Sequence, residues 1–329
     1  MTITRRSLLT ALPVAPLIAS RAALANEGDR RSATAIARDL DQLHSLLVTR
    51  AGETVLAETR RGGPNQPANI KSVSKTIHGL LAGMAIDRGI LTGPDQRVLP
   101  LLNRAPFGDA RDDLTIGHLL SMTAGLESTS GANYGAWVAS DDWVKFALSR
   151  DVVAEPGQRF IYSTGSWHIL GAALSQASGM SLWQMARDWL GQPLDITISP
   201  WIQDPQGRYL GGNEMALTPS ALARIGQMVL NQGEYAGERV VSADWLRTSW
   251  QPRARSPWSG DEYGYGWFTT KFAGFDAAYG RGYGGQLLVV VPSLDLSIAI
   301  ISDPTRPARS GGYFTELRQL VDQVIIEQV

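Results

Sequence analysis

The sequence predicts an α+β protein in which a central antiparallel sheet is flanked by helices and a mostly helical lobe is inserted into the chain. Strand-like segments lie toward both ends, at residues 43–48 and 53–58 and again at 286–291 and 294–301, with helical patterns between them. Apolar residues run almost unbroken through the last two segments, which is typical of central antiparallel strands. Because strands near both ends must share one sheet, the intervening helices form an inserted lobe.

The elements follow one another in a simple order. A first helix covers about residues 33–43, and the first two strands join at Ala51-Gly52. Further helices are expected from Ser72, at 114–122, 141–149, 166–178, 182–190 and 218–230, and a final amphipathic helix at 312–328. The predicted α/β lobe comprises about residues 26–75 and 206–329, and the helical lobe about 76–205. A chain of this size buries a large core, as one large domain or as two that share an interface.

The first 25 residues have the pattern of an export signal. A twin-arginine pair, Arg5-Arg6, precedes the apolar run 8–19, and Ala23-Leu24-Ala25 offers a small-residue cleavage site. The alternative is a retained membrane anchor, but the run is short and contains two prolines. We expect twin-arginine export, cleavage after Ala25 and, in a Gram-negative source, a periplasmic protein of residues 26–329 without a stable membrane anchor.

Composition excludes several functional classes. Cysteine is absent, so the chain has no disulfide and no thiol nucleophile. Removing residues 1–25, which hold three arginines and no acidic residue, changes the net charge from -1 to -4, so we expect no nucleic-acid partner. The four histidines lack metal-ligand spacing; we expect them to be structural, and we expect no metal and no cofactor.

Ser72 and Lys75 form the candidate catalytic pair. They lie three residues apart at the start of a predicted helix whose apolar positions, such as Ile77 and Leu80, recur at helical spacing. Residues three apart share a helix face, so the hydroxyl and the amine can meet. Burial would lower the pKa of the lysine enough for the neutral amine to act as a base. The helix N-terminus adds an N–H group for an oxyanion.

The spacing S-x-x-K is loose, and the alternative is a helix with an exposed lysine and a serine near its cap. The chain has only four lysines, and only Lys75 completes the pattern. Tyr162 likewise admits two interpretations. It precedes the apolar helix at 166–178, where its phenol could face a cleft or could pack in the core with its hydroxyl on a backbone partner.

Several motifs in order resemble the serine β-lactamase and penicillin-binding superfamily, and more closely its class C β-lactamase-like esterases and amidases, including 6-aminohexanoate-dimer hydrolases. The motifs are Ser72-Val73-Ser74-Lys75, the run 114–126, Pro156-Gly157 through Tyr162, the stretch 211–218, and Tyr283-Gly284-Gly285-Gln286 leading to Pro292. The resemblance covers nearly the whole mature chain. It implies a β-lactamase-like fold with the active site between the sheet and the helical lobe.

The resemblance also implies roles. Ser72 would be the nucleophile that forms an acyl-enzyme, Lys75 its base, and Tyr162 the residue that passes protons to the leaving group. The Ser72 N–H would form half of the oxyanion hole, and the strand near Gly282 and Tyr283 the other half.

Two motifs depart from the β-lactamase pattern. The motif Y-x-N is here Tyr162-Ser163-Thr164, so Thr164 stands where an amide would contact the acyl side chain of a β-lactam. The motif K-T-G is here part of residues 279–282, so the lysine that binds the β-lactam carboxylate is missing. Arg281 could supply a positive charge or point to solvent. The departures favour a small ester or a linear amide as the substrate.

Other functions stay open at this stage. They are β-lactamase or D-Ala-D-Ala peptidase activity, and a periplasmic module that binds an acyl or peptidoglycan ligand without turnover. Four aromatic residues either line the cleft and suit an apolar substrate or pack the helical lobe: Tyr134, Trp137, Trp143 and Trp201.

Overall fold

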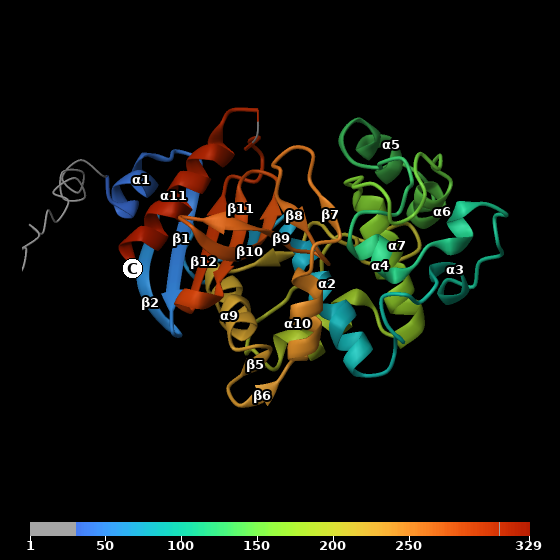
Figure 1. Cartoon of the computed structure of the whole chain (residues 1–329), viewed down its shortest axis with the longest axis horizontal. Helices are drawn as coiled ribbons and strands as arrows, with labels where there is room; N and C mark the ends of the chain where they lie inside the picture. The colour runs from blue at the N-terminus through green and yellow to red at the C-terminus, as the bar shows by residue number, and fades with distance from the viewer. Residues whose placement is uncertain (1–30, 309) are drawn as a thin grey trace, which may run out of the picture.

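The computed structural model describes residues 31–308 and 310–329, and a sheet of eight antiparallel strands organises them (Figure 1). The strand order is β2-β1-β12-β11-β10-β9-β8-β7. The strands are β1 (Leu43–Arg50), β2 (Glu53–Thr59), β7 (Ala254–Arg255), β8 (Glu262–Tyr263), β9 (Phe268–Phe272), β10 (Phe275–Gly282), β11 (Gln286–Val291) and β12 (Leu296–Ser302). The N-terminal hairpin β1-β2 therefore joins the sheet through β12, as the α+β prediction requires.

The two central strands match their prediction. Every residue of β11 and β12 is buried, because helices cover both faces of the sheet. β12 begins at Leu296 rather than at 294, since residues 292–294 form a turn of 3₁₀ helix and Asp295 has φ +47°. Two short pairs lie outside this sheet: β3 (Ala68–Asn69) with β4 (Ala216–Leu217), and β5 (Glu234–Tyr235) with β6 (Glu238–Arg239).

Helices surround the sheet and build the lobe between β3 and β4. They are α1 (Ala33–Asp39), α2 (Val73–Asp87), α3 (Val98–Leu101), α4 (Ile116–Leu120), α5 (Tyr134–Val138), α6 (Trp143–Leu148), α7 (Thr164–Ser178), α8 (Leu182–Met185), α9 (Pro219–Leu230), α10 (Ala243–Trp250) and α11 (Tyr313–Glu327). α3 to α7 lie to one side of the sheet (Figure 1), as predicted for the helical lobe. The exact lobe boundaries stay a prediction.

Each face of the sheet has its own helices. α1 and α11 pack together on one face, and the Ala33 N–H donates to a carboxylate oxygen of Glu327 at 2.7 Å. α9 and α2 cover the other face: Gly226 of α9 lies against Ser297, and Gly280 of β10 lies against Thr76 of α2. α2 therefore separates the sheet from the helical lobe.

The helix that begins after Ser72 differs from its prediction. We expect one apolar, buried face from the sequence, but residues 73–85 of α2 are all buried. The reason is its position, because α2 contacts β10 and β11 on one side and α7 and α10 on others. Its polar residues, including Lys75 and His78, consequently lie in the interior.

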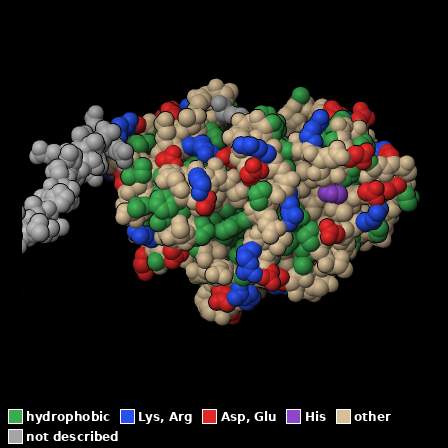
Figure 2. All heavy atoms as spheres, viewed as in Figure 1, with side chains coloured by type: hydrophobic (Ala, Val, Ile, Leu, Met, Phe, Trp, Pro, Cys, Tyr) green, Lys and Arg blue, Asp and Glu red, His purple; other side chains and the backbone are tan. Residues whose placement is uncertain are grey.

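Over the part of the chain that the structure describes, the face of the molecule shown in Figure 2 has no large patch of one charge. Acidic and basic side chains are interspersed over the face shown in Figure 2. Within the described residues, no helix is long and apolar enough to cross a membrane. The predicted export signal and its cleavage after Ala25 lie outside the described residues.

Gly280 lets α2 approach the sheet closely. A Cβ at this position would lie 2.4 Å from Thr76 Oγ1, which donates a hydrogen bond to the Gly266 carbonyl at 2.7 Å. Both partners are buried, so the hydroxyl cannot move without losing a buried hydrogen bond. The absence of a side chain at Gly280 thus allows the start of α2 to pack closely against β10.

Gly280→Ala should lower the free energy of unfolding by about 1–3 kcal/mol, because the added methyl overpacks this contact. Urea unfolding followed by circular dichroism measures the change. Gly63→Ala is the matched control: a Cβ there has no atom within 4 Å, so we expect a change below about 0.5 kcal/mol. Equal midpoints for Gly280→Ala and wild type would show that the contact is not tight.

Candidate active site

Ser72 is held at the junction of the two lobes by a short strand pair. β3 pairs with β4, and the Ile70 N–H donates to the Met215 carbonyl at 2.9 Å. Lys71 then adopts φ +48°, an uncommon conformation for a residue with a side chain, and the chain turns into α2. Ser72 occupies the N-cap position, but its hydroxyl makes no capping hydrogen bond. The hydroxyl is therefore available for chemistry.

The Lys75 amine lies against that hydroxyl. Its Nζ is 3.0 Å from Ser72 Oγ, 2.7 Å from the Gly212 carbonyl oxygen and 3.4 Å from Thr164 Oγ1. A neutral amine has two N–H donors and one lone pair. When the donors point to Gly212 and Thr164, the lone pair points to the Ser72 hydroxyl, which is the orientation a general base requires.

Burial also adjusts the charge of Lys75. The side chain is almost completely enclosed, with 2% of the residue exposed. Desolvation lowers the pKa of the Lys75 amine, and interaction with the Tyr162 phenol partly opposes that effect. The sequence alternative of an exposed lysine is therefore wrong, and the buried amine is closer to the neutral form than a surface lysine.

Gly212 brings its carbonyl to the amine because it has no side chain. Its φ is +76°, and a Cβ would lie 2.7 Å from Trp167 Cβ and 2.9 Å from Lys75 Cγ. Any larger residue would be strained and would displace the lysine. The sequence indicates a role for the 211–218 stretch only through its resemblance to the β-lactamase superfamily. The contact of Gly212 with Lys75 is visible only in the structure.

Tyr162 joins this group, two residues before α7. The Lys75 Nζ lies 5.0 Å from the centroid of the Tyr162 ring. The ring is partly buried against the core and meets the edge of Trp258, with centroids 6.4 Å apart. The structure thus combines the two alternatives: Tyr162 packs on the core, and its ring lies beside the candidate base Lys75.

The Thr164 hydroxyl lies between Lys75 and a serine of the helical lobe, and its predicted contact with substrate stays a prediction. Thr164 is the first residue of α7, and its hydroxyl lies 3.1 Å from Ser130 Oγ as well as near Lys75. α7 starts two residues earlier than predicted because distant side chains cap it. Ser130 Oγ accepts the Thr164 N–H at 2.9 Å, and Thr129 Oγ1 accepts the Gly165 N–H at 2.7 Å. Ser130 is a site residue that the sequence did not reveal.

The end of β10 lies beside Ser72, as predicted. A Cβ on Gly282 would be 2.4 Å from the Ile70 carbonyl oxygen, two residues before the serine. Tyr283 follows with 54% of its surface exposed. The end of β10 therefore lies against the segment that leads into Ser72, and the contact of Gly282 and Tyr283 with substrate stays a prediction.

Arg281 requires a correction. Its guanidinium lies 3.9 Å from the centroid of the Phe314 ring, on α11. Side chains alternate along a strand, so Gly280 and Gly282 face α2 whereas Arg281 faces the opposite side of the sheet. Arg281 is therefore not in the cleft, and its predicted contact with substrate is not supported.

The four aromatic residues that could either line the cleft or pack the helical lobe have different surroundings. Trp137 and Trp143 form a buried cluster in the helical lobe, with ring centroids 5.4 Å apart. The Trp201 ring is tilted against Tyr209, with centroids 4.9 Å apart, and its N–H donates to the Leu210 carbonyl at 2.9 Å. The Tyr134 hydroxyl accepts a hydrogen bond from Asn213, the neighbour of Gly212, at 3.3 Å. Tyr134 and Trp201 thus each make a side-chain hydrogen bond to the loop around Gly212, Tyr134 at Asn213 and Trp201 at Leu210.

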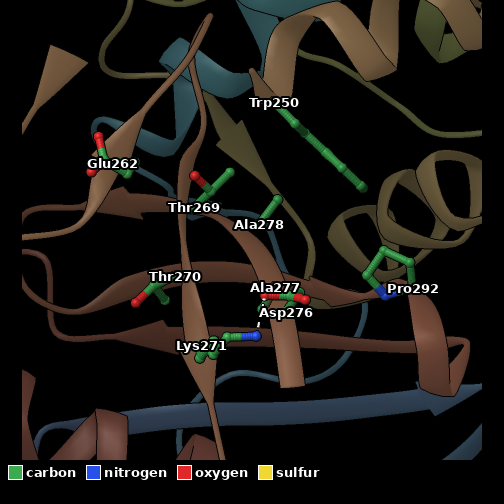
Figure 3. Close-up of a pocket in the computed structure, with 9 residues that line it drawn as sticks. All are labelled: Trp250, Glu262, Thr269, Thr270, Lys271, Asp276, Ala277, Ala278 and Pro292. Carbon is green, nitrogen blue, oxygen red and sulfur yellow. Dashed lines mark hydrogen bonds and ion pairs between the residues drawn. The ribbon is translucent and has the colours of Figure 1, made fainter. Parts of the chain in front are cut away.

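A separate cavity of about 330 Å³ lies among α10, β8, β9 and β10 (Figure 3). Trp250 and Pro292 form apolar walls, and Lys271 pairs with Asp276 at 2.6 Å. None of Ser72, Lys75 and Tyr162 lines it. Across the residues that the structure describes, no cluster of three histidine, aspartate or glutamate side chains could hold a metal ion.

The fold and the group Ser72, Lys75 and Tyr162 have the arrangement expected of the class of enzymes that use a serine nucleophile and a lysine base. The comparison with protein families gives the same answer, since the Beta-lactamase family model matches residues 34–323. The chain belongs to the beta-lactamase family of serine hydrolases.

Two relatives of known name and one solved structure are similar to this chain. A beta-lactamase of Escherichia coli (strain K12) is 29% identical over 46% of this chain and 41% of its own length. A 6-aminohexanoate-dimer hydrolase of Paenarthrobacter ureafaciens is 26% identical over 62% of this chain and 56% of its own length. This chain thus spans about half the length of these relatives. The solved structure of EstCE1, a hydrolase with promiscuous acyltransferase activity, is 20% identical, with a TM-score of 0.73 over 88% of this chain and 97% of that one. That likeness supports the β-lactamase-like fold.

Proposed function

We propose that this protein is a serine hydrolase that cleaves a small ester, or a linear amide, through an acyl-enzyme on Ser72. The observation that carries the proposal is the buried Lys75 amine, 3.0 Å from Ser72 Oγ and 2.7 Å from the Gly212 carbonyl oxygen. A lysine that is desolvated and aimed at a serine hydroxyl can remove its proton. A lysine in water at neutral pH cannot.

The proposed reaction has two halves. Lys75 accepts the Ser72 proton as Oγ attacks the substrate carbonyl, and the oxyanion forms beside the N-terminus of α2 and the end of β10. The C–O or C–N bond to the leaving group then breaks, and the leaving group takes a proton delivered through Lys75 and Tyr162. Water, activated by the same groups, attacks the acyl-enzyme and releases the acid, which restores Ser72.

The surroundings of Ser72 favour esters and amides over β-lactams. The position that carries the carboxylate-binding lysine in β-lactamases falls at 279–282 in this chain, and the only charged side chain there, Arg281, lies over Phe314 on the other face of the sheet. Exposed aromatic rings instead flank the cleft, with Tyr283 54% exposed and Trp258 57% exposed. Such rings suit an uncharged acyl group. Export to the periplasm remains part of this proposal, on the basis of the sequence of residues 1–25.

A substrate series tests this preference. We expect p-nitrophenyl butyrate to be hydrolysed with kcat/KM about 100-fold above that for nitrocefin, with butyryl-p-nitroanilide between them, because Arg281, the charged residue of segment 279–282, lies over Phe314 and not beside Ser72. Absorbance assays on one purified sample give all three values.

Two other outcomes have distinct meanings. Faster turnover of nitrocefin than of the ester would make the protein a β-lactamase. A stable acyl adduct on wild type, seen by mass spectrometry without product release, would indicate a binding module instead.

A further inference from the structure

The turn Gly211-Gly212, which supplies the carbonyl for Lys75, is held by a histidine from α2. His78 lies one helical turn after Lys75, and its Nδ1 accepts the Gly212 N–H at 2.7 Å. The ring is 1% exposed, and among the described residues its Nε2 has no hydrogen-bond partner. The polar contact of His78 with the protein is therefore made through Nδ1 to this turn.

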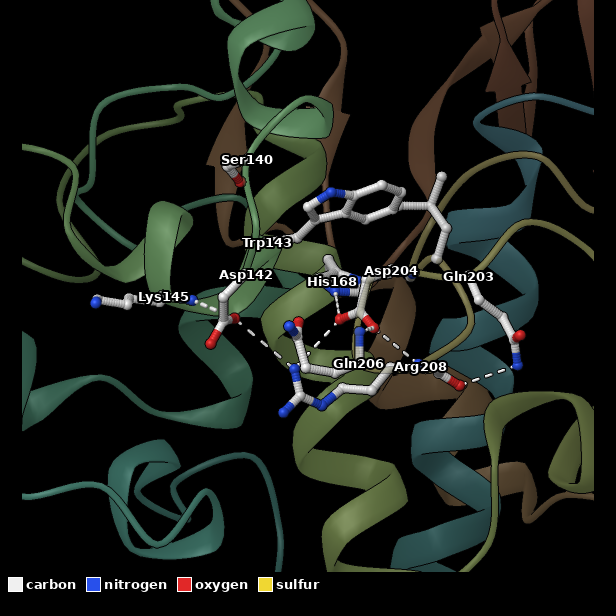
Figure 4. Close-up of polar contacts among 12 residues, drawn as sticks. Ser140, Asp142, Trp143, Lys145, His168, Gln203, Asp204, Gln206 and Arg208 are labelled. Carbon is white, nitrogen blue, oxygen red and sulfur yellow. Dashed lines mark hydrogen bonds and ion pairs between the residues drawn. The ribbon is translucent and has the colours of Figure 1, made fainter.

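A second histidine holds the turn from α7. His168 lies one helical turn after Thr164, and its Nδ1 accepts the Gly211 N–H at 3.2 Å. Its Nε2 lies 3.0 Å from Asp204 Oδ2, and Arg208 joins the same carboxylate oxygen at 3.2 Å (Figure 4). Asp204 in turn accepts the backbone N–H groups of Gln206 and Arg208. This network fixes the loop that ends at Gly212.

We infer that His78 and His168 are positioning residues for catalysis: as neutral rings protonated on Nε2, they hold Gly211-Gly212 from two helices, and the turn aligns the Lys75 amine. The inference rests on the proposed function, because alignment matters only if Lys75 is the base. It goes beyond the sequence prediction that all four histidines are structural.

The charge state follows from the donors. A backbone N–H can only donate, so each Nδ1 that faces one must be unprotonated. Burial lowers the pKa of His78 to about 3, and the nearby Lys75 adds to the effect. Burial also lowers the pKa of His168, although Asp204 opposes this. Both rings are thus neutral acceptors across the pH range in which Lys75 works.

The decisive test compares two amides at position 78. Asn places its oxygen where Nδ1 lies and can accept the Gly212 N–H, whereas the Gln oxygen falls near the Nε2 position, where the ring has no partner. We expect His78→Gln to lower kcat for p-nitrophenyl butyrate about 10-fold with KM within twofold, and His78→Asn to keep kcat within about threefold of wild type. Equal kcat for His78→Gln and wild type, or an equal fall in both variants, would overturn the inference.

A second measurement needs no variant to fold. In wild type labelled with ¹⁵N-histidine, long-range ¹⁵N–¹H spectra at pH 7 should show two buried rings protonated on Nε2 alone; protonation on Nδ1 would refute the arrangement. These spectra do not depend on turnover. If Ser72→Ala leaves hydrolysis unchanged while the rings show the expected tautomer, the proposed function has failed but the arrangement of the turn stands.

Discussion

Ser72→Ala should lower kcat/KM for p-nitrophenyl butyrate on the order of 10⁴-fold, because the variant has no oxygen to form the acyl-enzyme. The residual rate would come from the remaining groups of the site acting on water. The fold should be intact, since the Ser72 hydroxyl makes no capping hydrogen bond to α2. Initial rates of p-nitrophenol release measure the loss, and a fluorophosphonate probe followed by mass spectrometry should add to wild type but not to the variant.

The matched control for Ser72→Ala is Ser175→Ala, a replacement on the partly exposed side of α7. Alanine is a strong helix former, so this variant should have wild-type activity. If Ser72→Ala retained wild-type rates, Ser72 would not be the nucleophile and the proposed reaction would be wrong.

Lys75→Met should lower kcat/KM on the order of 10³-fold while Ser72 stays in place. Methionine fills a similar volume in the buried site but cannot accept a proton. Lys75→Arg should be about as inactive, because a guanidinium stays protonated. Lys145→Met, which removes an exposed lysine on α6, is the control and should leave the rate unchanged.

The pH dependence separates a base from a merely structural lysine. Lys75 acts as the neutral amine, so kcat/KM of wild type should fall as the pH drops through the pKa of Lys75. Because burial lowers that pKa from 10.5, the fall should be centred below 10.5. Lys75→Met should lose this limb of the profile. A wild-type profile without it would argue against Lys75 as the base.

Local sequence patterns predicted much of the fold for physical reasons. β11 and β12 can be recognised from unbroken apolar runs, because both faces of the sheet are covered by helices. The start of α9 can be recognised from Thr218, whose hydroxyl accepts the Ala221 N–H at the beginning of the helix. The start of α7 was misplaced by two residues because its caps, Ser130 and Thr129, lie more than 30 residues earlier in the chain. Such caps leave no local signal.

The candidate site also has parts that the sequence predicts and parts that only the tertiary structure shows. The sequence by itself determined the nucleophile and base candidates, since residues three apart on a helix meet whatever the rest of the chain does. Only the tertiary structure decided that Lys75 is buried, because that depends on the sheet, α7 and α10 enclosing α2. It likewise placed Arg281 on the far face and brought Gly212, His78 and His168 together. Contacts between segments more than 30 residues apart arise from packing, and no spacing within one segment encodes them.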